Sequence, residues 1–281
     1  MSKLFVIGNG ESRKNFDLEQ LRPHGKIYGC NGLHRDFTPD ALTCVDPGIT
    51  HEVYDNRYAK DNVCYYRGWT SLPGDLYEQM KNTHIEDMST RFGSEPKLIE
   101  SERYEGSTEF VIHGSTALMQ DKLLEEQRPY KGIGANVLFI SWLHPKDNVT
   151  RIDDIMNLND GKTGDCGWSA GPTAMSIGCV VEKPDEVYMI GCDLYSNTDN
   201  FNNLYKSTLH YERDDIAAVI PVNWLTQYST AMVINSNTDF YKVNEKPLGT
   251  DNINKEIPEW NDLLNLKYIT QEELINKYLT K

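Results

Sequence analysis

Short apolar runs that end in a glycine, asparagine or aspartate constrain the fold of this chain more than any other sequence feature. The first three runs occupy residues 3–7, 26–30 and 42–45. Gly8, Asn31 and Asp46 follow these runs directly. Apolar runs bounded by turn residues are typical of buried strands, and the stretches between them are long enough for crossovers. We therefore predict an α/β fold with a Rossmann-like, mostly parallel sheet and helices on both faces.

A second α/β unit follows in the later part of the chain. Residues 169–181 form an apolar run with Ser169 at its start and Pro172 in its first turn, which is typical of a helix N-terminus. The next apolar run, residues 187–193, ends at the carboxylate of Asp193. Beyond it, the pattern predicts a helix near residues 222–234, a strand at residues 239–243 and helical spacing over residues 258–279.

The periodicity weakens between residues 68 and 160, where Gly, Ser, Glu and Tyr interleave. Within this segment, residues 116–126 have helical spacing and residues 137–143 form an apolar run. We interpret residues 68–160 as an insertion, a lid over the sheet, within a single Rossmann-like domain that spans residues 1–281.

The charge balance narrows the partners that we expect. The formal net charge is −14 over 281 residues, so a broad basic surface for nucleic acid is disfavoured, although a local basic groove is not excluded. No stretch reaches the ~18 to 20 apolar residues of a membrane span, and the chain starts on a strand instead of a signal peptide. We therefore expect no membrane span and a cytoplasmic location.

The cysteines and histidines form no metal-binding pattern. The six cysteines are scattered without a CxxC motif, and the seven histidines form no HxH or HxxxH pair. We therefore expect reduced, mostly buried cysteines and no metal cofactor. A GxSxG motif is absent as well, so a hydrolase is a weak interpretation.

The residues after the first predicted strand are candidates for ligand binding, because ligands bind at the carboxyl edge of a parallel sheet. Gly8, Asn9, Gly10 and Ser12 stand there, where glycine amides and a helix N-terminus suit a phosphate. The segment lacks the G-x-G-x-x-G dinucleotide fingerprint, since Arg13 stands in place of the third glycine. A nucleotide-dependent dehydrogenase is therefore disfavoured.

Four more residues are predicted to reach the same edge. Asn31 and Asp46 end the second and third strands, and turn formation is the alternative role for such residues. Ser169 and Gly171 belong to a glycine-rich segment that leads into a helix, which suits backbone contact with a nucleotide or a sugar. The nearby residues 161–163 (GKT) lack the upstream glycine of a P-loop, so we reject an NTPase.

The candidates for catalysis begin at Asp193. This carboxylate is a candidate base or a partner of a sugar hydroxyl, and capping of the following loop is its structural alternative. Tyr195 and Tyr205 follow it, and paired tyrosine hydroxyls can donate hydrogen bonds to a departing phosphate. Such donors supply the charge stabilisation that a metal ion would otherwise provide.

Four segments of the chain, taken together, resemble the bacterial sialyltransferases that decorate lipooligosaccharides and the relatives of these enzymes in large tailed bacteriophages. The segments are residues 5–12 (FVIGNGES), 29–32 (GCNG), 168–171 (WSAG) and 188–195 (YMIGCDLY). Each segment is short, but their order and spacing together make the resemblance more specific. The middle of the chain and its C-terminal part lie outside it.

The resemblance implies a metal-independent glycosyltransferase with one Rossmann-like domain, a lid and no cofactor. Its donor would be a nucleotide sugar, CMP-linked as in the family or UDP-linked. By resemblance, seven residues contact this donor: Asn9, Ser12 and Asn31 at the nucleotide, Ser169 and Gly171 at the donor, and Tyr195 and Tyr205 at the leaving phosphate.

Two departures from the family change the expected chemistry. The family has an arginine for the sialic acid carboxylate just before the helix, and Gly167 stands there in this chain. Where the family has its histidine base, this chain reads Val222-Asn223-Trp224, so His210 or Asp193 becomes the candidate base. Since losing a charge-assisted contact is costly, we expect a sugar without a carboxylate.

We therefore predict a glycosyltransferase that moves a sugar, other than sialic acid, from a nucleotide sugar to an acceptor hydroxyl. The phage relatives suggest a hydroxymethylated base of phage DNA as the acceptor, in which case the enzyme works in the host cytoplasm. A surface glycan is the competing acceptor. The alternatives are a surface-glycan sialyltransferase-like enzyme and a non-catalytic protein that binds or sequesters a nucleotide. The sequence leaves the oligomeric state open.

Overall fold

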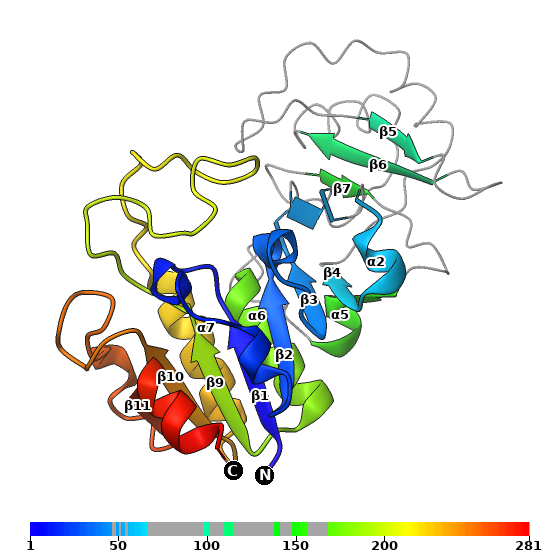
Figure 1. Cartoon of the computed structure of the whole chain (residues 1–281). Coiled ribbons are helices and arrows are strands. Elements are labelled where there is room, and N and C mark those ends of the chain that lie inside the picture. The colour runs from blue at the N-terminus through cyan, green and yellow to red at the C-terminus, as the bar shows by residue number, and fades with distance from the viewer. Residues whose placement is uncertain are drawn as a thin grey trace.

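The computed structural model describes residues 1–46, 49–50, 52–53, 56–66, 98–101, 109–114, 138–140, 148–156 and 168–280. Its centre is a sheet of eight parallel strands (Figure 1). In chain order these strands are β1 (Lys3–Ile7), β2 (Lys26–Cys30), β3 (Ala41–Cys44), β4 (Cys64–Tyr66), β8 (Val149–Arg151), β9 (Glu186–Ile190), β10 (Asp239–Asn244) and β11 (Leu266–Thr270).

The strand order reverses once within this sheet. The order is β11-β10-β9-β1-β2-β3-β4-β8, so the chain first builds outward from β1 in one direction and then adds β9 on the other side of β1. In doubly wound sheets such a reversal is the topological switch point, where a crevice forms outside the carboxyl ends of the strands. The predicted α/β fold with a parallel sheet is therefore confirmed.

Both faces of the sheet are covered, as the near-continuous apolar character of its strands requires. Leu4 and Val6 of β1 point to one face, where they share a core with α6 (Ala170–Glu182) and α7 (Val222–Ile234). Phe5 and Ile7 point to the opposite core. That core includes residues of four short helices, namely η2 (Glu19–Leu21), η3 (Asn31–Arg35), α2 (Tyr58–Asp61) and the π-helix η5 (Leu274–Tyr278).

The other short helices are η1 (Glu11–Arg13), α5 (Ile152–Ile155), η4 (Pro258–Trp260) and α8 (Gln271–Glu273). Two expectations about helices are wrong. The helix expected after Gly10 is only the three-residue 3-10 helix η1. The helical spacing over residues 258–279 is interrupted by β11, because Leu266–Thr270 pairs in parallel with β10 and this tertiary pairing overrides the local pattern.

The predicted insertion lies mostly outside the described residues, as does the helical run at residues 116–126. The described part contains a separate antiparallel sheet of β5 (Leu98–Ser101), β6 (Glu109–Gly114) and β7 (Leu138–Ile140), and β7 falls in the predicted apolar run. β8 also falls between residues 68 and 160, but it pairs with β4, so the parallel sheet resumes before residue 160. Within the described ranges, no helix is both long and apolar enough to span a membrane.

Candidate ligand-binding site

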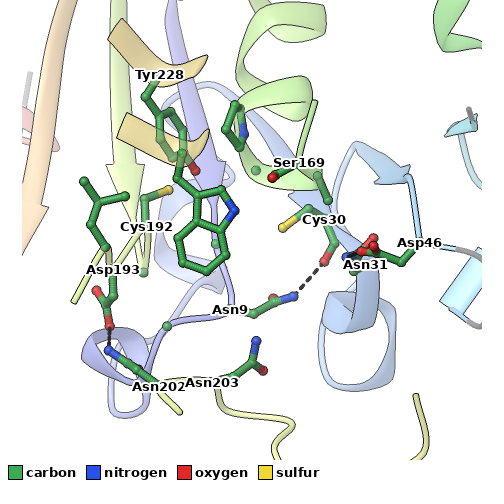
Figure 2. Close-up of a pocket in the computed structure, with 18 of the residues that line it drawn as sticks. Asn9, Cys30, Asn31, Asp46, Ser169, Cys192, Asp193, Asn202, Asn203 and Tyr228 are labelled. Atoms are coloured by element: carbon green, nitrogen blue, oxygen red, sulfur yellow. Dashed lines mark hydrogen bonds between the residues drawn. The ribbon is translucent and has the colours of Figure 1, made fainter. Parts of the chain in front are cut away.

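A cavity of about 240 Å³ opens at the carboxyl edge of the sheet, between the ends of β1 and β9 (Figure 2). We name it the switch-point cavity, because the strand order reverses between these two strands. Seven of the eight residues predicted to bind a donor line it: Gly8, Asn9, Gly10, Asn31, Asp46, Ser169 and Gly171. The topology brings these residues together, since they come from the ends of three strands and the start of one helix.

The turns after β1 and β9 touch each other at the cavity. The amide of Gly8 donates to the Ile190 carbonyl and that of Gly10 to the Gly191 carbonyl, both at 2.8 Å. A Cβ atom on Gly8 would lie 2.3 Å from the Gly191 carbonyl oxygen, so only glycine allows this approach. The two turns therefore form one continuous wall.

Asp193 anchors these turns with its carboxylate. One oxygen accepts hydrogen bonds from the Ser12 amide at 3.0 Å and the Asn202 side chain at 3.1 Å, and the other accepts from the Ser12 hydroxyl at 2.6 Å. Ser12 is buried and does not line the cavity, unlike the other predicted donor-binding residues. Asp193 itself lines the cavity, but its observed contacts are those of an anchor.

The N-terminus of α6 forms a second wall. Ser169 is the N-cap residue in extended conformation, and its side chain makes no capping hydrogen bond. The amides of Ala170 and Gly171 belong to the first turn, where backbone N–H groups have no partner within the helix. A helix of 13 residues carries a partial positive charge at this end, which suits an anion.

Asn9 and Tyr211 leave one acceptor and one donor unpaired at the cavity. The Asn9 Nδ2 group donates to the Cys30 carbonyl at 3.1 Å and to the Tyr211 hydroxyl at 3.3 Å. Because a carbonyl can only accept, this orientation of the amide is fixed. The buried Asn9 Oδ1 then has no hydrogen-bond partner among the described residues.

The Tyr211 oxygen accepts a second hydrogen bond, from the Gly32 amide at 2.8 Å. Burial raises the pKa of Tyr211 well above its ordinary value, so the hydroxyl keeps its proton. We find no acceptor for this proton in the described part of the chain. A ligand in the cavity can therefore accept a hydrogen bond from Tyr211, whereas Asn9 Oδ1 is shielded from solvent.

The ends of β2 and β3 complete the wall. Asn31 has a left-handed backbone with φ of 46°, and its side-chain amide donates to Asp46. Two thiols also line the cavity: burial raises the pKa of Cys30 to about 12 and that of Cys192 to about 11. Both thiols are therefore protonated at neutral pH, and neither is an activated nucleophile.

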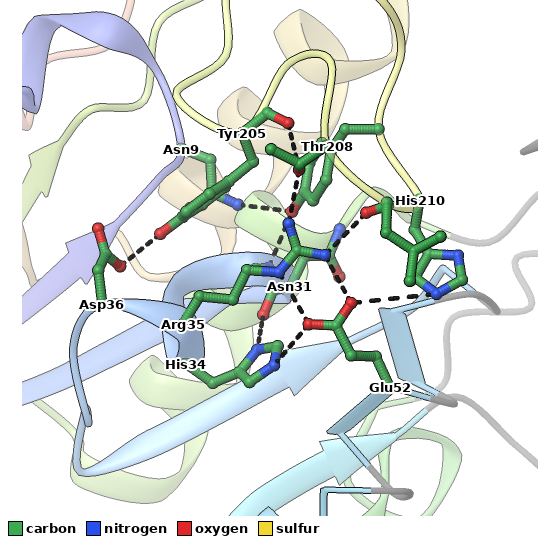
Figure 3. Close-up of polar contacts among 12 residues, drawn as sticks. Asn9, Asn31, His34, Arg35, Asp36, Glu52, Tyr205, Thr208 and His210 are labelled. Atoms are coloured by element: carbon green, nitrogen blue, oxygen red, sulfur yellow. Dashed lines mark hydrogen bonds and ion pairs between the residues drawn. The ribbon is translucent and has the colours of Figure 1, made fainter.

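Three of the predicted catalytic residues lie outside the switch-point cavity. Tyr195 lines a smaller neighbouring hollow, and the Lys255 ammonium sits 3.6 Å from the centre of its ring. Tyr205 donates to Asp36 at 2.5 Å and accepts from Arg13 at 2.9 Å (Figure 3). His210 lies in the same region, with its Nε2 4.0 Å from Glu52. The loop after β9 therefore places these three side chains away from the switch-point cavity.

Five of the residues that line the cavity lie outside the segments from which site residues were predicted: Asn202, Asn203, Tyr211, Trp224 and Tyr228. Trp224 and Tyr228 are four residues apart on α7 and therefore share one face, a signal that the predicted helix already contained. The other three lie in an irregular loop, where no periodicity exists to indicate them. Among the described residues, no group of three or more His, Cys, Asp or Glu side chains could hold a metal ion.

No family model, curated protein or solved structure matches this chain. The assignment of a function therefore depends on the geometry of the cavity and on the sequence resemblance.

Proposed function

We propose that the chain is a metal-independent glycosyltransferase that binds a nucleotide-sugar donor in the switch-point cavity. The observation that carries this proposal is the position of the cavity, which opens where the strand order reverses and has the N-terminus of α6 in its wall. Nucleotides bind at this place in open α/β sheets. The Tyr211 hydroxyl is a second indication of a ligand, because it lines the cavity and its proton has no acceptor among the described residues.

The phosphate of the donor fits best against the start of α6. No Lys, Arg or His stands among the described residues that line the cavity, so backbone amides have to supply the positive potential. The amides of Ala170 and Gly171 point out of the helix start and meet this need. The carboxylates of Asp46 and Asp193 disfavour a second negative group, which supports a sugar without a carboxylate.

Tyr211 and Tyr228, instead of Tyr195 and Tyr205, are the candidate hydrogen-bond donors to the leaving phosphate. Burial raises the pKa of both hydroxyls well above the ordinary value, so they stay protonated; the Tyr211 proton has no acceptor among the described residues, whereas the Tyr228 hydroxyl hydrogen-bonds the Cys192 thiol. In the transfer, the oxygen of the acceptor hydroxyl attacks the anomeric carbon and its proton passes to a general base, while the bond to the phosphate oxygen breaks and the phosphate leaves with the electron pair. Hydrogen-bond donors aimed at this developing charge lower the barrier. Of the two predicted bases, Asp193 lines the cavity and His210 does not.

A dehydrogenase is less well supported. The dinucleotide fold holds a pyrophosphate at the N-terminus of the helix that follows the first strand. Here that position is occupied by η1, a 3-10 helix of three residues, which has no comparable dipole.

Binding tests the proposal first. We expect one nucleotide out of CMP, UDP and GDP, alone or as its common sugars, to raise the midpoint of thermal unfolding, whereas NAD leaves it unchanged. The bound sugar nucleotide should then be slowly hydrolysed without acceptor, and faster with an acceptor glycan or hydroxymethylated DNA. No shift with any nucleotide would refute the proposal. Binding with complete return of intact donor would identify a sequestering protein.

Gly171→Ala and its control Gly178→Ala, both on α6, test whether the nucleotide binds in the switch-point cavity. A Cβ on Gly171 would lie 2.3 Å from the Tyr228 hydroxyl at the cavity, and one on Gly178 would lie 2.6 Å from a Leu4 methyl in the core. Both substitutions crowd a buried side chain and should cost about 1–3 kcal/mol of stability. We expect Gly171→Ala to weaken nucleotide binding at least about tenfold, equivalent to about 1.4 kcal/mol, and Gly178→Ala to leave it unchanged.

A further inference from the structure

A cluster of residues joined by ion pairs and hydrogen bonds lies beside the switch-point cavity and outside it (Figure 3). We name it the Arg35 cluster: Arg35, His34, Glu52, Thr208 and Leu209. Arg35 donates from Nε to one Glu52 oxygen at 2.8 Å and from Nη2 to the other at 2.5 Å. Burial opposes ionisation of Glu52, but hydrogen bonds from His34 and Arg35 lower its pKa to about 2. The pair is therefore ionised at neutral pH.

The other edge of the guanidinium holds the loop that contains Tyr211. Arg35 donates to the Thr208 hydroxyl at 2.6 Å and to the Leu209 carbonyl at 2.7 Å. Its central carbon also lies 5.6 Å from the Tyr205 ring centre and 5.3 Å from that of Tyr211. A planar group with five fixed donors can make these contacts together, whereas a lysine ammonium cannot.

This loop needs such support, because its backbone is strained. Ser207 has φ of 61° and His210 has φ of 68°, a region that residues other than glycine rarely adopt. Such conformations persist only where the surroundings hold them in place. Arg35 donates hydrogen bonds to Thr208 and Leu209, the two residues between these positions. Tyr211 follows directly after His210.

We infer that Arg35 is a positioning residue for the ligand site, acting through Tyr211. It fixes residues 207–210 so that the Tyr211 hydroxyl reaches the Gly32 amide and the Asn9 side chain and presents its proton to the cavity. The part of this inference that concerns a nucleotide rests on the proposed function. The placement of Tyr211 by Arg35 does not.

The first experiment measures this placement without any ligand. In the whole chain carrying Arg35→Lys, we expect hydrogen exchange of the Gly32 amide to accelerate about tenfold or more, because its acceptor is the Tyr211 hydroxyl. Arg213→Lys is the matched control, since Arg213 lies in the same loop and its side chain pairs with the exposed Asp215. Unchanged exchange at Gly32 in Arg35→Lys would overturn the inference.

The second experiment is a double-mutant cycle with CMP and UDP as probes. We expect Arg35→Lys and Tyr211→Phe each to raise the Kd of the nucleotide about tenfold, and the double variant to raise it hardly further. Additive effects would overturn the inference, because a merely structural ion pair does not act through the Tyr211 hydroxyl. If wild type binds neither probe, the proposed function loses its support, and the exchange of Gly32 still decides the inference.

Thr208→Val is the alternative test variant if the Arg35→Lys protein does not fold. It removes the hydroxyl that accepts from Arg35 Nη1, and Thr208 is an exposed residue. We expect a smaller acceleration at Gly32 in the same direction. No acceleration in folded Thr208→Val, with Gly32 as slow as in Arg213→Lys, would count against Arg35 as the residue that holds the loop.

Discussion

The switch-point cavity and the Arg35 cluster are neighbours that use buried polar atoms in opposite ways. In the cluster, Arg35 donates four hydrogen bonds, and Glu52 accepts two of them. At the cavity, the Tyr211 hydroxyl accepts two hydrogen bonds and donates none to the described residues. Leaving a buried polar group unpaired costs about 1–3 kcal/mol of stability. We therefore expect such groups mainly where another interaction, such as ligand binding, offsets this cost. The Arg35 cluster is therefore held together by its own hydrogen bonds, whereas the Tyr211 hydroxyl at the cavity still has a donor that a ligand can use.

Glu52→Gln should cause the largest loss of stability, because it removes the carboxylate that pairs with Arg35 in the cluster. It leaves the Arg35 guanidinium mostly buried without its carboxylate, and we expect a loss of about 2–4 kcal/mol of unfolding free energy. Ser169→Ala in the cavity is expected to cost less than about 0.5 kcal/mol, since the Ser169 side chain makes no capping bond. Urea denaturation measures both. Equal losses would contradict the distinction between the two regions.

The loss of stability in Glu52→Gln should depend on pH, which gives a second test of the difference between the Arg35 cluster and the switch-point cavity. The pKa of Glu52 is depressed from 4.5 to about 2 in the folded protein, so its contribution is present above the unfolded value and is lost as pH falls toward 2. The stability gap between wild type and Glu52→Gln should therefore narrow as the pH falls below about 4.5. Urea midpoints at a series of pH values test this. A gap that stays constant down to pH 2.5 would show that the Glu52 charge does not stabilise the cluster.

Much of the fold could be predicted from the sequence, because buried strands and amphipathic helices have a local signature. The runs at residues 3–7 and 26–30 became β1 and β2, and the helix expected at residues 222–234 became α7. β11 was missed, since its half-exposed residues depend on pairing with β10 for their conformation. Residues at the strand ends were located correctly because parallel topology alone brings them to one edge.

The rest of the candidate site could not be predicted, for a physical reason. Residues 195–221 form a loop without regular periodicity, and its path depends on contacts with distant residues such as Arg35 and Asn9. Tyr205 and His210 were therefore expected at the ligand and lie outside the cavity, whereas Tyr211 was overlooked and lines it. A tyrosine in such a loop carries no sequence signal that separates the two outcomes.

Asp193→Asn should have only a small effect on sugar transfer if Asp193 is an anchor, and it tests whether this cavity residue resembles the cluster in its role. Asparagine can still accept from the Ser12 amide, and the Ser12 hydroxyl can reverse its hydrogen bond toward the new NH₂ group. We therefore expect the rate of sugar transfer to fall less than about tenfold, with a loss of stability of about 1 kcal/mol. A catalytic base would instead lose about 10²- to 10⁴-fold in kcat, with little change in KM. Steady-state kinetics on the donor identified by binding separates the two roles, because an anchor that loosens the wall raises KM and a base lowers kcat.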